Sequence, residues 1–392
     1  MIRLYRRERI NSLLVSACIA ETNICAILDT FFTIPMVSVL LLVLICVIGV
    51  LLNGKRLHIT SNSVIAYVLF MLLLVFSIFL NGFSVAGERM LYFLSFGTTA
   101  MLVVNTKYDT RLILKYLLYI YAIHLIVYFL FQRVTLLDSD DYWRAQMGVA
   151  YGFVPSIIVC IIFLLFRDKL VDIDIFNNHK WMQFLFYAVI LFASVYVCLI
   201  DCGTRGVIVV AIVGLTLLIL RKLSKKQRVL FGIIGAAFLL FIHLNWNTIL
   251  SSSLDRFAES NVKALVKLSQ LIEYGDVSNG RENHYDVAIK MIKENPILGY
   301  GVGFFENQTK ASYVHQLFLE LMLDCGLFGT ILFLIPIFKL IKKTRKENDD
   351  IAYSFKVVLL SCSFLPLLFS SSFWLYPPFW VGYFYALKHK NH

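Results

Sequence analysis

The chain is poor in charged residues. Only 16% of its 392 residues are charged, whereas 59% are hydrophobic and the mean hydropathy is +0.77. A soluble domain typically has about a quarter of its residues charged, so this composition excludes an ordinary soluble protein. The apolar residues form runs of roughly 16–25, the length that crosses a bilayer as a helix. We therefore expect an all-α, polytopic membrane protein.

The chain also lacks the short motifs that hold metals, disulfides and nucleotides. Its eight cysteines lie mostly within apolar runs, with no CxxC pair and no His/Cys metal spacing, and we interpret them as packing residues. The segment 299–305, GYGVGFF, lacks the Lys-Ser/Thr of a P-loop and is interpreted as a turn that lets backbone approach closely. The acidic residues Asp138, Asp140 and Asp141 are interpreted as solvated, not metal-binding. No metal and no cofactor is expected.

Positive charge is abundant by contrast, and the formal net charge is +11. The basic residues lie in short loops between the apolar runs, which indicates membrane topology and not a nucleic-acid partner. One set of alternate loops holds Arg3, Arg6, Arg7, Arg9, Lys55, Arg56, Lys107, Arg111, Arg167, Lys169, Lys180, Arg221, Lys222, Lys225, Lys226, Arg228, Lys339, Lys342, Lys343, Arg345, Lys346, Lys388 and Lys390. The short loops of the other set hold few, namely Arg89, Arg133, Arg144 and Arg205, and the one long loop on that side carries little weight in the charge rule. The positive-inside rule therefore predicts that both termini are cytoplasmic.

About twelve spans are predicted from the apolar runs, at 11–28, 34–52, 62–80, 90–104, 112–131, 148–166, 182–200, 205–220, 229–245, 314–338, 355–370 and 374–388. The first run is the weakest, since Glu21, Asn23 and Asp29 interrupt it, and it either spans or lies in the interface. Its basic start is not followed by a small-residue cleavage site, which indicates an uncleaved span and not a signal peptide.

The spans divide the chain into residues 1–245, a loop at 246–312 and residues 313–392. The topology places this large loop outside the cytoplasm. Within it, 254–272 and 281–293 have apolar residues at helical spacing. Two amphipathic helices at a membrane surface can roof a cavity in the bundle, and polar segments of this kind are where a membrane protein has groups for chemistry.

Three residues on the non-cytoplasmic side are candidates for that chemistry. Arg205 opens a span, and Arg281 follows a glycine at the start of the second amphipathic helix. Either is a surface arginine or an anion clamp, because a guanidinium binds pyrophosphate oxygens bidentately and stays charged. For Arg205, Asp201 lies one helical turn earlier and offers a structural partner. His315 begins the span that follows the loop. It is either structural or a general base, since its ordinary pKa suits deprotonation of a hydroxyl near neutrality.

Three segments together resemble the O-antigen ligase and polymerase superfamily of bacterial envelope glycosyltransferases. They are TRG (204–206), GREN…AIKMIKENPILGYGVGFF (280–305) and SYVHQLFLELMLDCGLFG (312–329). The layout of spans with one large late loop also agrees. Two positions depart from the family pattern, namely Gln316, where Asn is commoner, and Asp324-Cys325, where Glu and a small residue are usual.

The resemblance implies a glycosyltransferase C-type fold in the bacterial inner membrane with a periplasmic active face. Its donor would be a glycan on undecaprenyl pyrophosphate and its acceptor a glycan hydroxyl, with a chain-length regulator as a further partner. By the same resemblance, Arg205 and Arg281 bind the pyrophosphate and His315 is the catalytic base. Placement suggests that 138–141 and 373–379 line the acceptor groove.

The kind of transfer stays open at this point. The form of 312–329 favours a polymerase of O-antigen or capsule repeat units, and a ligase that transfers the glycan to lipid A-core is the alternative. A transporter of lipid-linked saccharides would be expected to have two similar halves, and the sequence shows no internal repeat.

Overall fold

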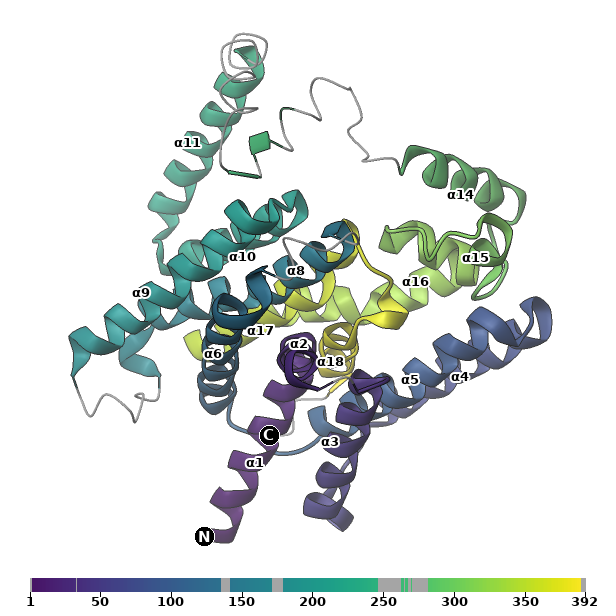
Figure 1. Ribbon diagram of the computed structural model, residues 1–392, viewed down its shortest axis with the longest axis horizontal. Coiled ribbons are helices and arrows are strands. Elements are labelled where there is room, and N and C mark those ends of the chain that lie inside the picture. The colour runs from purple at the N-terminus through teal and green to yellow at the C-terminus, as the bar shows by residue number, and fades with distance from the viewer. Residues whose placement is uncertain are drawn as a thin grey trace.

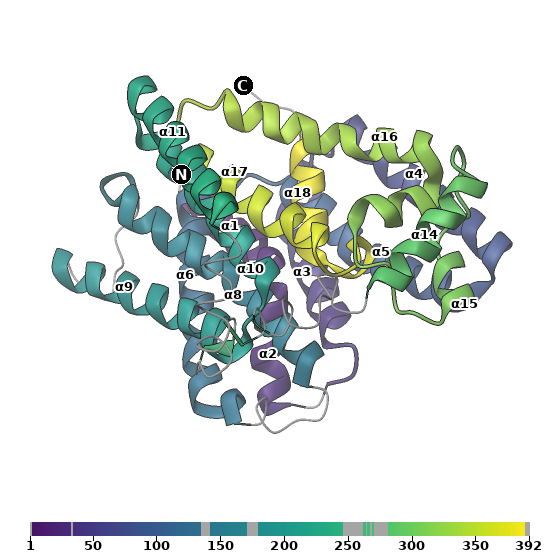
Figure 2. The same cartoon turned by 90° about the horizontal axis from the view of Figure 1, so that it is seen from above.

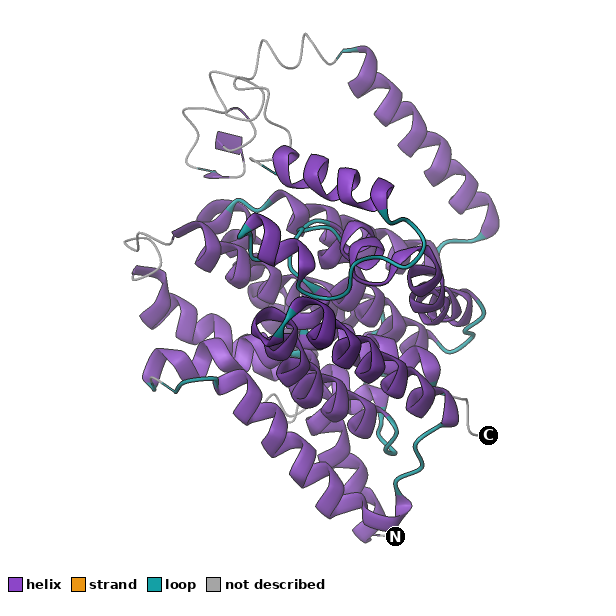
Figure 3. Ribbon diagram, turned by 90° about the vertical axis from the view of Figure 1, so that its right-hand side faces the viewer, coloured by secondary structure: helices purple, strands orange, loops and turns teal. Residues whose placement is uncertain are grey.

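The computed structural model describes residues 2–32, 34–134, 142–170, 179–245 and 281–388, together with 262, 263, 265, 266 and 269. Within these residues every regular element is helical (Figure 3). The helices of the first half are α1 (Ile2–Ile19), α2 (Glu21–Phe31), α3 (Val37–Asn53), α4 (Ser61–Asn81), α5 (Phe83–Val104), α6 (Thr110–Val127) and α8 (Tyr142–Leu165). Those of the second half are α9 (Lys180–Tyr196), α10 (Arg205–Lys222), α11 (Lys225–Leu244), α14 (Glu282–Glu294), α15 (Phe304–Thr309), α16 (Leu317–Arg345), α17 (Asp350–Leu359) and α18 (Pro377–Leu387). The all-α prediction is confirmed.

Several helices are continued by short turns of tighter or wider helix. The π-helical turns are η2 (Tyr128–Gln132), η5 (Val197–Cys202) and η6 (Leu360–Phe364). The 3₁₀ turns are η1 (Gly54–Arg56), η3 (Arg167–Lys169), η7 (Leu365–Leu368) and η8 (Phe373–Leu375). π-Helical turns often accompany functional sites, and here they extend the ends of α6, α9 and α17.

Six described helical segments are long and apolar enough to cross a membrane, beginning at Ser61, Thr110, Gln146, Lys180, Leu317 and Asp350. The predicted runs at 34–52, 90–104, 205–220, 229–245 and 374–388 are also helical, as α3, α5, α10, α11 and α18. The chain is thus a multi-pass helical membrane protein, while the number twelve and the C-type assignment stay predictions.

The first apolar run is sharply bent. Its two halves, Arg6–Ile19 and Glu21–Phe31, meet at an angle of 78°. Neither half lies free at a surface, because α1 buries Asn11, Ser12 and Ser16 and α2 buries Glu21 and Asn23. The bend directs α2 across the ends of α6 and α8 (Figures 1 and 2). The sequence interpretation of this run as either a plain span or an interfacial helix did not include such a break.

The large loop is only partly described. The predicted helix at 254–272 falls outside the described residues, apart from the few named above. The predicted helix at 281–293 is confirmed as α14, which packs beside α15 and the first part of α16 (Figures 1 and 2). Ala288 on its inner face is buried against a small cluster with Phe305, Val314 and Leu323.

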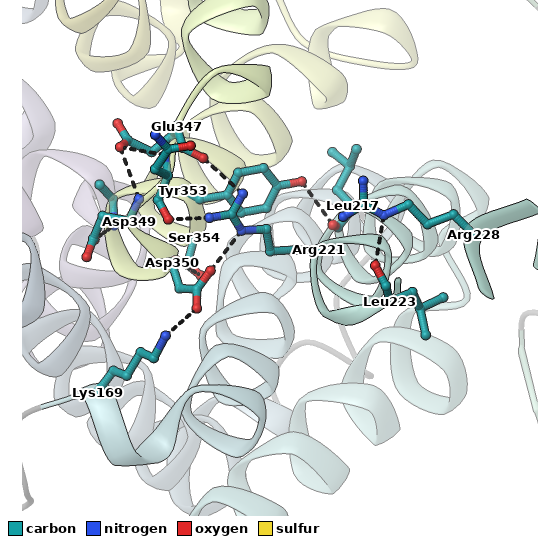
Figure 4. A network of polar contacts seen from close by, with 12 residues as sticks. Lys169, Leu217, Arg221, Leu223, Arg228, Glu347, Asp349, Asp350, Tyr353 and Ser354 are labelled. Carbon is teal, nitrogen blue, oxygen red and sulfur yellow. Dashed lines mark hydrogen bonds and ion pairs between the residues drawn. The ribbon is translucent and has the colours of Figure 1, made fainter. Parts of the chain in front are cut away.

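The basic loops meet at one end of the bundle, which we call the basic end. Asp350, at the start of α17, accepts from Lys169 Nζ at 2.5 Å and from Arg221 Nε at 2.8 Å. Arg221 also donates to the carbonyls of Glu347 and Asn348 (Figure 4). Nearby, Lys343 donates to the carbonyl of Lys388 at 2.8 Å, and Lys388 donates to that of Val104 at 2.9 Å. Segments that the positive-inside rule assigned to one face therefore lie together.

Candidate active site

A polar pocket of about 590 Å³ lies at the other end of the same helices. Its lining comes from the α1–α2 break, the first turns of α8, the start of α14, the segment before α16 and the connection between α17 and α18. The residues are Ile19, Thr22, Asn23, Met147, Gly148, Tyr151, Gly152, Pro155, Arg281, His284, Ser312, Tyr313, His315, Pro366, Ser370, Ser371, Leu375, Tyr376 and Pro378. We call this the central pocket. It contains two of the three predicted site residues.

His315 lines the central pocket, and its backbone has a strained conformation. Its φ is 64°, and Ser371 across the pocket has a φ of 69°. Residues other than glycine rarely occupy this left-handed region, and where they do the surrounding structure must hold them there, often at functional sites. The imidazole packs against the ring of Tyr313 with a centroid distance of 4.1 Å.

A buried arginine anchors the segment that carries His315. Arg89 on α5 is only 4% exposed, and its Nη2 donates to the carbonyl of Ser312 at 3.1 Å. Glu306 on α15 lies 3.9 Å from the same nitrogen. Burial raises the pKa of Glu306, and the nearby Arg89 acts in the opposite direction. This pair joins α5, α15 and the segment before α16.

Arg281 differs from Arg89 in its partners. Its Nη1 donates to the carbonyl of Phe369 at 2.5 Å and its Nη2 contacts Met147 Sδ at 3.9 Å. No carboxylate of the described residues forms an ion pair with it. A guanidinium held in this way presents unneutralised positive charge to a partly enclosed pocket, which suits an anion.

Arg205 is the first residue of α10 and is not part of the lining. The next residue, Gly206, packs so closely that a Cβ there would lie 2.1 Å from the hydroxyl oxygen of Tyr151 and 3.0 Å from Cβ of Phe369. Tyr151 lines the central pocket, and Phe369 is the residue whose carbonyl accepts from Arg281. The structure therefore brings Arg281 and His315 into one pocket and places Arg205 directly beside it.

Asp201 has a partner other than its neighbour in sequence. Its two oxygens accept from Arg133 Nε at 3.0 Å and Nη2 at 3.1 Å, and Tyr128 donates to it at 3.1 Å. These residues lie at and just after η2, so the carboxylate ties the end of α6 to η5. The structural partner that the sequence offered for Arg205 thus serves Arg133.

The GYGVG segment binds a kink in α16. At Gly326, where φ is 60°, the helix is interrupted, and Tyr300 N–H donates to the carbonyl of Leu323 at 2.6 Å while Gly301 N–H donates to that of Asp324 at 3.1 Å. A Cβ on Gly299 would lie 2.6 Å from the same Leu323 oxygen. The interpretation of this segment as a close-approach turn is confirmed.

Two buried acids on α16 hold the wall of the pocket opposite α14. Glu320 accepts from the Ser372 hydroxyl, and Asp324 accepts from Trp374 Nε1 at 2.8 Å. Asp324 is one of the two departures from the family pattern, and here it keeps an acceptor at that position. These bonds fix the segment that contains Ser370, Ser371 and Tyr376.

Sequence reasoning missed several pocket residues, including Asn23, Tyr151, His284 and Ser371. Asn23 and Tyr151 lie on apolar helices, Ser371 lies on the connection between α17 and α18, and His284 lies on α14. The break between α1 and α2 brings Asn23 to the pocket. The suggested aromatic segment 373–379 contributes Leu375, Tyr376 and Pro378 to the pocket, whereas its Phe and Trp residues are buried in the core. The acidic segment 138–141 lies outside the described residues.

An apolar groove of about 780 Å³ runs along α10, α16 and α17. At one end it reaches Leu317, two residues after His315, and Leu368, the residue before Phe369. At the other it reaches the basic end at Arg221 and Arg345. The segment 365–370 lies between the groove and the central pocket, since Leu365 and Leu368 line the groove and Pro366 and Ser370 line the pocket.

Residues 186–334 match the model of the family described as O-antigen ligase. The matched segment contains Arg205, Arg281, His315 and the kink at Gly326. No curated protein and no solved structure matches the chain.

Proposed function

Since residues 186–334 place this chain in the O-antigen ligase/polymerase superfamily, whose members are membrane glycosyltransferase-like enzymes, we propose that it polymerises lipid-linked repeat units. The donor is an oligosaccharide on undecaprenyl pyrophosphate, and the acceptor is a hydroxyl of another repeat unit. The reaction takes place at the periplasmic face of the inner membrane, with the basic end and both termini in the cytoplasm.

The observation that carries this proposal is the composition of the central pocket. It combines a guanidinium that has no carboxylate partner among the described residues with an imidazole on a strained backbone. An anion site beside a general base is what transfer from a pyrophosphate leaving group requires.

The chemistry then follows from these groups. His315 takes the proton from the acceptor hydroxyl, and the resulting oxygen attacks the anomeric carbon of the donor. The bond from that carbon to the pyrophosphate oxygen breaks with inversion, and its electron pair leaves with the carrier pyrophosphate. Arg281, with Arg205 beside the pocket, stabilises the charge that develops there. Removing one such group typically costs about 10²–10³ in rate.

The apolar groove supplies a place for the hydrocarbon tail of the carrier. Its upper end at Leu317 and Leu368 lies next to the pocket, so a pyrophosphate at Arg281 can continue into a chain between α10 and α16. Replacing Leu334, which lines the groove, with Trp should raise the KM for the lipid-linked donor several-fold without lowering the melting temperature. An unchanged KM would argue against this path.

The first test is His315→Ala in the native host, with the surface polysaccharide separated on a gel and the protein quantified in the membrane. His179→Ala is the matched control, because His179 is exposed at the start of α9, away from the pocket. A polymerase predicts loss of every band above one repeat unit on lipid A-core, while the control keeps its ladder.

The same gel distinguishes the alternatives. A ligase, the activity named in the description of the matched family, would lose all core-attached bands and leave long chains on the carrier lipid. An unchanged ladder with His315→Ala would remove the catalytic role of His315 and favour a transporter of lipid-linked saccharides.

A further inference from the structure

A second cavity of about 890 Å³ adjoins the central pocket. The two share Thr22, Gly148 and Gly152 as a common wall. The rest of the second cavity is formed by one side of α2, from Cys25 to Phe31, by the end of α6 with η2, and by Val149 of α8. The mechanism above uses none of these residues.

A directed chain of hydrogen bonds runs from the central pocket into this cavity. Asn23 Nδ2 lies 2.7 Å from His124 Nδ1 and donates to the carbonyl of Gly152 at 3.0 Å. His124 Nε2 lies 3.2 Å from Gln132 Oε1, and Gln132 Nε2 donates to Thr30 Oγ1 at 2.7 Å. His124 is 1% exposed and stacks on Phe153 at 4.5 Å.

This chain fixes the orientation of each polar group. If Asn23 donates to Nδ1, His124 is neutral and its Nε2–H donates to the Gln132 oxygen. Both N–H groups of Asn23 are then used, so its Oδ1 is the atom left to accept from a ligand in the central pocket. A wall of this kind is rigid, because each member is bonded to the next.

The mouth of the second cavity combines aromatic and polar side chains. Phe31 and Phe131 are 51% and 52% exposed, with ring centroids 5.3 Å apart at 71°. Asp29, also exposed, lies one helical position before Thr30 on the same cavity. A carboxylate in the same lining as the rings indicates a wet interface and not hydrocarbon, where a charge is costly.

The charge of this lining differs from that of the central pocket. Its described residues include a carboxylate and no Lys or Arg, so it does not suit a pyrophosphate. Pyranose rings have an apolar C–H face and hydroxyl edges, which match exposed aromatic rings beside carboxylate, amide and hydroxyl groups.

We propose that this second cavity is the acceptor subsite and that it binds the sugar residues next to the attacking hydroxyl. The assignment rests on the proposed glycosyl transfer. Phe31 and Phe131 contact the C–H faces of the sugars, while Asp29 and Thr30 accept from their hydroxyls. The acceptor then passes over Thr22 and Gly152, so that its reactive hydroxyl reaches His315 in the central pocket.

The test measures two ligands on the purified full chain in detergent. The saccharide probe is the repeat-unit oligosaccharide released from the host polysaccharide, free of lipid and phosphate. The anion probe is undecaprenyl pyrophosphate in mixed micelles. Calorimetry should show that Phe131→Ala weakens oligosaccharide binding by about ten-fold, as the loss of an aromatic contact implies, and that Asp29→Asn weakens it less. Phe131→Trp should restore it. None of these three variants should affect undecaprenyl pyrophosphate binding.

Arg281→Ala is the reciprocal control, since it should lose undecaprenyl pyrophosphate and keep the oligosaccharide. Phe131 and Asp29 are exposed, so their variants should fold, which the melting temperature checks. Oligosaccharide binding that is absent in the wild type, or equal in the wild type, Phe131→Ala and Asp29→Asn, would overturn the acceptor subsite. The proposed function would fail separately, through a wild type that does not bind undecaprenyl pyrophosphate or a His315→Ala variant that still makes polymer.

Discussion

Arginines at the two ends of the bundle have very different surroundings. At the basic end, Arg221 contacts the Asp350 carboxylate at 2.8 Å and two backbone carbonyls, and its guanidinium lies 5.0 Å from the centre of the Tyr353 ring. At the pocket end, Arg281 contacts one carbonyl and one thioether sulfur. The Asp350 carboxylate neutralises the first guanidinium, whereas no carboxylate of the described residues forms an ion pair with the second.

The difference is not one of position alone, because Arg89 and Arg133 also lie toward the pocket end. Glu306 lies 3.9 Å from Arg89, and Asp201 lies 3.0 Å from Arg133. Both therefore resemble Arg221 and join helices. A buried charge is costly unless an opposite charge compensates it. The partners of an arginine therefore indicate whether it stabilises the fold or binds a ligand, and its burial and neighbours in sequence indicate this less well.

Arg281→Ala should have the largest effect on catalysis. We expect turnover of lipid-linked repeat units by the purified protein to fall about 10²–10³-fold with little change in melting temperature, because Arg281 forms no ion pair with a carboxylate of the described residues. Arg281→Lys should recover only part of the rate, since an ammonium lacks the bidentate fork. A melting temperature several degrees lower with normal turnover would make Arg281 a structural arginine like Arg221.

Gly326→Ala should damage the support of the pocket. The new Cβ would lie 2.2 Å from the carbonyl oxygen of Ile297, at a φ of 60°. Backbone strain alone costs about 1–3 kcal/mol, so thermal unfolding in detergent should begin at a clearly lower temperature and activity should fall with it. Gly235→Ala on α11, where a Cβ meets nothing within 4 Å, is the control. Equal melting curves for the two variants would contradict the kinked geometry.

Arg133→Ala tests whether an arginine toward the pocket end can be purely structural. Among the described partners of Asp201, which is 4% exposed, it leaves the Tyr128 hydroxyl, and we expect a loss of about 2 kcal/mol in unfolding free energy. Undecaprenyl pyrophosphate binding by the folded fraction should be unchanged. Weaker undecaprenyl pyrophosphate binding without loss of stability would show that Arg133, like Arg281, binds the ligand.

Asp350→Asn should have the smallest effect of the four. It removes the charge that Lys169 and Arg221 share at the basic end, in a partly exposed pair, so about 1 kcal/mol of stability is expected to be lost. The melting temperature should fall slightly less at high salt, and the turnover of the folded protein should stay normal. Loss of turnover with an unchanged melting temperature would show that the two ends are coupled.

The sequence predicted those elements whose position depends on the spacing of apolar residues within a short segment. The apolar spacing of 281–293 predicted α14 within one residue at each end, and the runs of about 20 apolar residues predicted the spans. It was uninformative where a break had to be placed, as at Ala20, because Glu21 and Asn23 could mean either an interfacial helix or polar residues packed inside. Only the neighbouring α6 and α8, which supply His124 and the Gly152 carbonyl, decide this.

The sequence by itself determined that this is a helical membrane protein, which loops carry its positive charge, and that Arg205, Arg281 and His315 are its candidate site residues. The bilayer selects apolar segments as spans and orients them by the basic residues of their loops. Both effects depend on local sequence, so they can be predicted without tertiary contacts. The tertiary structure decided that Arg281 and His315 share one pocket, that Asp201 belongs to Arg133, and that a second cavity opens beside Thr22. These depend on which helix ends meet. Contacts between residues 68 positions apart, as for Arg133 and Asp201, or 129 positions apart, as for Asn23 and Gly152, leave no local pattern.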